Sequence, residues 1–166
     1  MAELTNLESK LGEVVGLAMA AQDATQKVAK LAKDDGDDAL VTTLERMRDE
    51  AKETADRGTE VASAFEGKKT AILDEAREVK QKAQEMMKSY LDQASDALDG
   101  FEFLTMAEAG EVGHWEILGT LNERAGSSEV RELVEWALPI QQRHLETVRK
   151  ASLELASEED PNETSS

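Results

Sequence analysis

Apolar residues recur along the chain at alternating steps of three and four, which is the spacing of one face of an α-helix. The first of these stripes predicts a helix over residues 3–33 and comprises Leu4, Leu7, Leu11, Val14, Ala18, Ala21, Thr25 and Val28. Gly12 and Gly16 lie four residues apart in this helix and would let a second helix approach closely. The acidic segment DDGDD at 34–38 predicts a turn and an N-cap for the next helix.

The same spacing predicts four further helices. The second stripe begins at Leu40 and ends at Gly67, and the third helix is expected from about Thr70 to about Gly100. The third has a thinner apolar face, for which we expect Ile72, Ala76, Val79, Ala83, Met86 and Tyr90. The fourth and fifth helices are expected at 101–125 and 128–157, with a kink at Pro139.

These elements predict an all-α fold, an antiparallel four-helix bundle with the third helix as an additional helix or arm. Met47, Met86 and Met87 are expected in the core. Residues 1–157 are expected to form a single helical-bundle domain. The polar residues 158–166 are expected to form a flexible acidic tail.

The net charge of the chain argues against two classes of binding partner. Its 166 residues carry a formal net charge of -17, which argues against binding to nucleic acid or to an anionic membrane. The chain has no cysteine, so disulfides and thiolate metal sites are excluded. We expect no secretion signal or membrane span, and therefore a cytoplasmic protein.

Polar residues interrupt the predicted stripes of the last two helices at matching places. Glu111 and His114 interrupt the fourth stripe, and Gln141 and His144 interrupt the fifth. A turn centred near residue 127 would bring Glu111 level with His144, and His114 level with Gln141, to within about one residue rise. Glu108 lies one helical turn before Glu111. The stripes therefore predict a cluster of polar side chains inside the hairpin.

Such a cluster has the ligands of a metal site. Imidazole and carboxylate groups bind iron, manganese or zinc, and a buried carboxylate needs a cation or a hydrogen-bond donor beside it. Turn counting brings Glu50, Glu53 and Glu85 to a similar height, although they flank their stripes. It places Glu13 away from this level.

The paired motifs resemble those of the ferritin-like di-iron carboxylate superfamily, in which two helices each contribute a Glu-x-x-His motif. The resemblance covers residues 101–157. It implies Glu111, His114 and His144 as metal ligands, with Gln141 and Glu108 as further ligands or partners. It also implies iron as the metal, and iron handling or peroxide and oxygen chemistry as the function. Gln141 stands where the family has glutamate, which favours a single metal or a site completed across a homodimer.

Two alternatives remain open from the residues alone. In the first alternative, the cluster is a structural polar layer and binds no metal. Glu111 then pairs with His144, and Gln141 pairs with His114, which sets the helix register. The protein would then be a non-catalytic scaffold or adaptor that binds a partner protein or a second copy of itself, for example through the third helix. An acidic mimic of nucleic acid is the third hypothesis.

Overall fold

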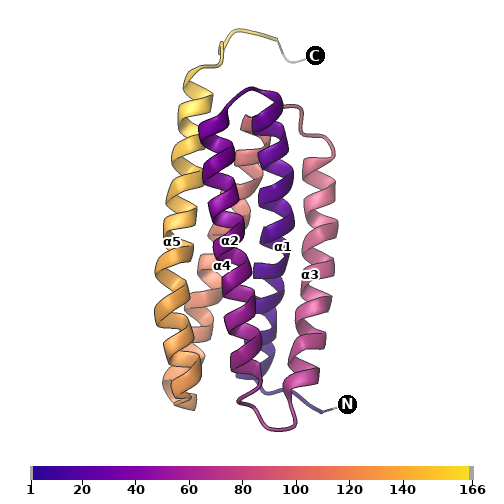
Figure 1. Cartoon of the computed structure of the whole chain (residues 1–166), viewed down its shortest axis with the longest axis vertical. Helices are drawn as coiled ribbons and strands as arrows, with labels where there is room; N and C mark the ends of the chain where they lie inside the picture. The colour runs from indigo at the N-terminus through magenta and orange to yellow at the C-terminus, as the bar shows by residue number, and fades with distance from the viewer. Residues whose placement is uncertain (1, 165–166) are drawn as a thin grey trace.

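The computed structural model describes residues 2–164, and within them the chain forms five helices, each antiparallel to the one before (Figure 1). They are α1 (Asn6–Asp34), α2 (Asp38–Ala62), α3 (Lys69–Leu91), α4 (Ala97–Ala125) and α5 (Ser128–Ser157). The prediction of an all-α bundle is confirmed. None of these helices is long and apolar enough to cross a membrane.

Four of the helices enclose the core. α1 packs against α2 and α4, and α5 packs against the same two helices, which closes a four-helix arrangement. α3 packs mainly against α1, on the outside of this group, and touches α2 and α4 only slightly. The third helix is therefore the additional one, as its thin apolar face predicts. α1 contacts three neighbours, which explains why its buried surface is wider than one stripe.

The contact between α1 and α3 depends on two glycines. A Cβ atom on Gly12 would lie 2.7 Å from the carbonyl oxygen of Ile72, and one on Gly16 would overlap the carbonyl oxygen of Ala76. The lack of side chains lets the two backbones touch, as predicted from the spacing of these glycines. Each step of four residues along α1 matches a step of four along α3, so these two helices run parallel.

Helix caps explain where the observed bounds differ from the predicted ones. α3 ends at Leu91 rather than near residue 100, and α4 begins at Ala97 rather than at 101. The Asp96 side chain caps α4, and the Asp35 carboxylate accepts a hydrogen bond from the Ala97 N–H. These two acceptors satisfy N–H groups that a helix start leaves free. α2 ends at Ala62, before the turn that contains Gly67.

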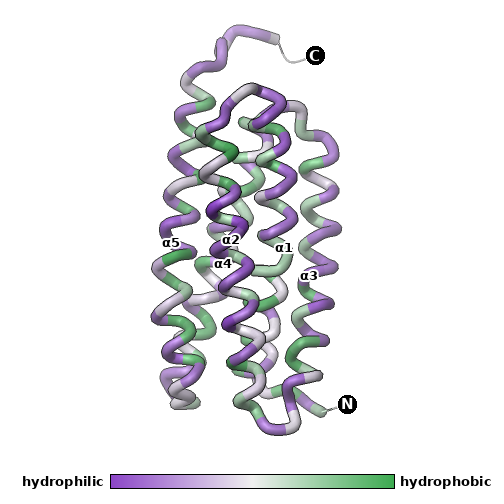
Figure 2. Tube along the Cα trace, viewed as in Figure 1, coloured by the Kyte–Doolittle hydropathy of each residue, from purple (hydrophilic) through white to green (hydrophobic). Residues whose placement is uncertain are grey.

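The core consists of two apolar clusters, one in each half of the bundle. One surrounds Leu44 and Phe101, and the other surrounds Leu11 and Trp115. Hydrophobic and hydrophilic residues alternate along every helix (Figure 2). Between the two clusters, α4 and α5 contribute buried polar residues, which are Glu108, Glu111, Gln141 and His144. Glu108, Gln141 and His144 form a polar layer that interrupts the core at mid-height, and Glu111 lies beside this layer.

Candidate functional site

The polar layer comes from a buried stripe on α5 and a shifted stripe on α4. On α5 the prediction holds almost throughout, since Val130, Ala137, Gln141, His144, Val148 and Ala151 are all buried. On α4 the buried residues include Leu104, Glu108, Glu111, Trp115, Leu118 and Asn122. Glu108 and Trp115 thus take the places predicted for Ala107 and His114. The side chain of His114 remains 34 % exposed.

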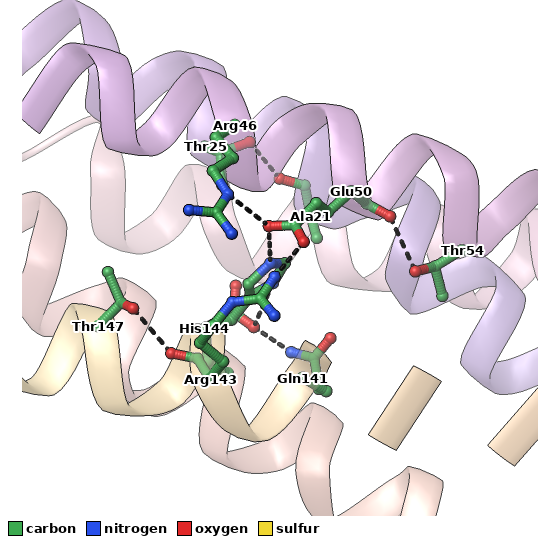
Figure 3. A network of polar contacts seen from close by, with 10 residues as sticks. Ala21, Thr25, Arg46, Glu50, Thr54, Gln141, Arg143, His144 and Thr147 are labelled. Atoms are coloured by element: carbon green, nitrogen blue, oxygen red, sulfur yellow. Dashed lines mark hydrogen bonds and ion pairs between the residues drawn. The ribbon is translucent and has the colours of Figure 1, made fainter. Parts of the chain in front are cut away.

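Three helices contribute to the polar layer. The Gln141 side-chain amide donates a hydrogen bond to the Glu108 carboxyl group. His144 Nε2 lies 3.2 Å from Glu50 Oε1, and His144 Nδ1 lies 4.0 Å from Glu108 Oε2. Figure 3 shows Glu50 reaching from α2 toward both His144 and Arg143, which also donates to its carboxylate. Turn counting places Glu50 at this height, and its long side chain reaches the layer from beside the α2 stripe.

The pairs expected within the hairpin do not form. No hydrogen bond joins Glu111 to His144 or His114 to Gln141 in the described part of the chain. Instead, His114 faces α1, where its Nδ1 lies 3.2 Å from Lys10 Nζ and 3.3 Å from Glu13 Oε1. The expectation that Glu13 lies away from this level is wrong. The shift of the α4 stripe by one position turns His114 toward α1 rather than α5.

Burial favours the neutral forms of Glu108, Glu111 and His144. It raises the pKa of Glu108 to about 8, although the hydrogen bond from Gln141 opposes the rise. Burial, together with the nearby Glu108, raises the pKa of Glu111 well above its usual value. Burial also lowers the pKa of His144. Glu50 differs, because hydrogen bonds from Arg143 and His144 outweigh its partial burial and lower its pKa.

Glu111 borders a cavity on the other side of α4. The cavity has a volume of about 500 Å³ and lies between α1, α3 and α4. Apolar side chains form most of its wall, and they include Leu17, Ala20, Val79, Ala83, Met86, Phe103, Met106 and Ala107. Glu13, Glu75, Lys82 and His114 supply its other polar groups. Glu111 is only 6 % exposed, and among residues 2–164 no hydrogen bond to its carboxyl group is found.

The buried face of α3 differs from the predicted one near the cavity. Met86 and Tyr90 are 56 % and 54 % exposed, although both were predicted on the buried stripe. Ile72, Ala76, Met87 and Leu91 are the buried residues of α3, so the stripe shifts by one position in the second half of the helix. Met87 is in the core as predicted, and Met86 is not. Apolar side chains consequently remain in contact with solvent beside the cavity.

The predicted metal ligands divide between these two environments. Glu108, Gln141 and His144 lie in the polar layer, Glu111 lines the cavity, and His114 faces α1. In the part of the chain that the structure describes, no group of three or more His, Asp or Glu residues is arranged to hold a metal ion. The donor set of a ferritin-like centre is therefore not assembled in this arrangement.

Comparison with known protein families, curated proteins and solved structures finds no match for this chain. No family match supports the ferritin-like resemblance. The fold is an all-helical bundle of five packed helices.

Proposed function

We propose that the protein is a non-catalytic helical binding protein, which takes a small ligand into the cavity between α1, α3 and α4. The observation that carries this proposal is the mostly apolar cavity of about 500 Å³ with the buried carboxyl group of Glu111 in its wall. Small-molecule sites usually have volumes of about 300–1,000 Å³, apolar walls and a few polar groups that orient the ligand.

In this proposal the polar layer has a structural role. Its support is that Glu108, Gln141, His144 and Glu50 pair with one another across three helices. A layer of buried hydrogen bonds penalises any sliding of one helix along another, because a shifted register leaves polar groups unpaired. The layer would therefore hold α4 and α5 in place beneath the cavity.

The proposal is tested with Nile red, a neutral dye whose fluorescence rises in apolar surroundings. Gly110 lines the cavity, and a Cβ atom built on it meets nothing within 4 Å. Gly110→Leu should therefore fill the cavity without strain, and we expect it to reduce dye binding at least about tenfold. Gly113→Leu is the matched control, because Gly113 is also in α4 and unobstructed but does not line the cavity. Equal dye binding by the two variants would contradict the proposal.

Self-association is a second candidate, supported by the exposed Met86 and Met106, which line the cavity, and by the exposed Tyr90, which lies against Phe103. A second copy of the chain would cover these side chains and form a homodimer. Sedimentation velocity of the wild type and of a Met86→Ser, Tyr90→Ser double variant separates the two candidates. A wild-type dimer that the double variant dissociates would favour self-association, and a monomer in both would exclude it.

Metal binding, which the resemblance implies, stays a separate hypothesis. Its remaining support is that His144 lies between the carboxyl groups of Glu50 and Glu108. Iron, manganese or zinc would have to displace the hydrogen bonds of the polar layer to bind there.

A further inference from the structure

We propose that the ligand of the cavity is a small cationic amphiphile, with an apolar body that fills the cavity and a primary ammonium group that pairs with the Glu111 carboxylate. This inference rests on the function proposed above and specifies the ligand of that same site.

Glu111 differs from the other buried polar groups of the bundle. Glu108 accepts a hydrogen bond from Gln141, and His144 contacts Glu50, whereas no hydrogen bond holds the carboxyl group of Glu111 within residues 2–164. Among residues 2–164 no fully buried side-chain oxygen or nitrogen lacks a hydrogen-bond partner, so the carboxyl oxygens of Glu111 are accessible from the cavity that this residue lines. A hydrogen-bond donor on a ligand in the cavity would reach them and supply the partner that the protein does not.

The charges around the cavity favour a cation over a neutral or anionic ligand. Glu13 on α1 and Glu75 on α3 line its wall together with Glu111, and Glu108 lies behind Glu111 on α4. The basic groups are Lys82 in the wall and Lys10, whose ammonium group already binds His114 and Glu13. Lys10 is paired with Glu13, which leaves the carboxyl groups of Glu75 and Glu111 and the ammonium group of Lys82 to face a ligand. Acidic groups outnumber basic groups among these three, which favours an ammonium group over a carboxylate.

The apolar wall requires the rest of the ligand to be apolar. Leu17, Val79, Met86, Phe103 and Met106 line the cavity from three helices. Each CH₂ group of an alkyl chain that becomes buried raises the affinity about fourfold, so a chain of several carbons supplies most of the affinity. The ammonium group then supplies selectivity, because a charge-assisted hydrogen bond to Glu111 is stronger than one from a neutral donor.

The ammonium group and the carboxylate form of Glu111 stabilise each other. Burial and the nearby Glu108 raise the pKa of Glu111, and a cation bound beside it lowers that pKa again, because an opposite charge favours the charged form.

Displacement of Nile red by octylamine, 1-octanol and octanoate tests the inference, since these probes share a chain and differ in head group. For the wild type at pH 8 we expect octylamine to displace the dye at about tenfold lower concentration than 1-octanol, and octanoate to be the weakest. In Glu111→Gln the preference for octylamine over 1-octanol should fall below about threefold, with 1-octanol unchanged. Glu78→Gln removes the same charge from an exposed position of α3 that does not line the cavity, and it should retain the preference.

Each outcome bears on a different claim. If the dye does not bind the wild type, or binds the Gly110→Leu variant equally well, the proposed function fails. If the dye binds but 1-octanol competes as well as octylamine, the ligand class is wrong and the cavity remains a binding site. If Glu78→Gln abolishes the preference as fully as Glu111→Gln does, the effect is one of overall charge, and the assigned pairing with Glu111 is overturned.

Discussion

The side-chain amide of Gln141 on α5 donates a hydrogen bond to the buried carboxyl group of Glu108 on α4. A glutamate at position 141, as in a ferritin-like motif, would bring a second buried carboxyl group against the first. Two such groups need a cation or a shared proton between them, whereas the amide supplies a donor without charge. This residue therefore explains how the layer satisfies its polar groups without a metal.

Replacing Gln141 by leucine should destabilise the protein by about 1–3 kcal/mol, because Glu108 loses its donor and stays buried. The free energy of unfolding, measured by urea denaturation at neutral pH, checks this. Gln142→Leu is the matched control, since Gln142 is the next residue of α5 and is exposed. If both variants were equally stable, the hydrogen bond would contribute nothing measurable to the fold.

The stability of the protein should decrease as the pH rises from 6.5 to about 8. The folded state raises the pKa of Glu108 from 4.5 to about 8, so in this window the folded protein binds a proton that the unfolded protein has lost. The free energy of unfolding then falls as the pH rises, by up to about 1.4 kcal/mol per pH unit for one carboxyl group. Glu111, whose pKa is also raised, acts in the same direction.

Urea denaturation at several pH values measures this slope, and Glu108→Gln should flatten it because glutamine does not titrate. The pKa of His144 is lowered, so His144 destabilises the folded state only as the pH falls below its usual value of 6.5. The chosen window thus separates the carboxyl groups from the histidine. A wild type whose stability does not change between these pH values would contradict the raised carboxyl pKa values.

Gly16→Ala should destabilise the bundle by about 1–3 kcal/mol. Its Cβ atom would overlap the carbonyl oxygen of Ala76, which belongs to the α3 backbone and cannot rotate away. Gly113→Ala provides the comparison, since a Cβ atom there meets nothing within 4 Å and should stabilise α4 by about 1 kcal/mol. Thermal and urea unfolding of both variants would show opposite shifts. Stabilisation by Gly16→Ala would mean that α3 is not seated on α1 as described.

Elemental analysis of the protein purified without an affinity tag, alongside His144→Ala, decides the metal hypothesis. We expect less than stoichiometric iron, manganese and zinc in both proteins, because the candidate ligands are divided between the polar layer, the cavity and α1. Near-stoichiometric metal in the wild type that His144→Ala removes would overturn this expectation. It would show that Glu50, Glu108 and His144 rearrange around an ion.

Much of the fold follows from local patterns. The three-four spacing predicts all five helices, and the thin apolar face of residues 69–91 predicts that this helix lies outside the four-helix core. The spacing of Gly12 and Gly16 predicts a close helix contact. These features depend on residues within one helix, so they can be predicted without knowing which other helices pack against it.

The prediction of the site depended on which of two possible stripes of α4 is buried in the bundle. Leu104, Glu111 and Leu118 belong to both, and the steps between them can be filled by Ala107 and His114 or by Glu108 and Trp115. Both choices alternate steps of three and four. The larger Trp115 fills the core beside Leu118, which leaves His114 at the edge facing α1. A similar choice between Met86 and Met87 on α3 left Met86 at the mouth of the cavity.

By itself, the sequence determined the helices, the bundle class and the burial of Glu111, Gln141 and His144, because these depend on periodicity along one chain segment. Only the tertiary structure decided which buried groups meet. Glu108 pairs with Gln141, Glu50 reaches His144, and Glu111 lines a cavity bounded by α3. A rotation of α4 by one residue position leaves its pattern almost unchanged but redirects each polar side chain to another neighbour, so packing against α1, α3 and α5 selects the pairs.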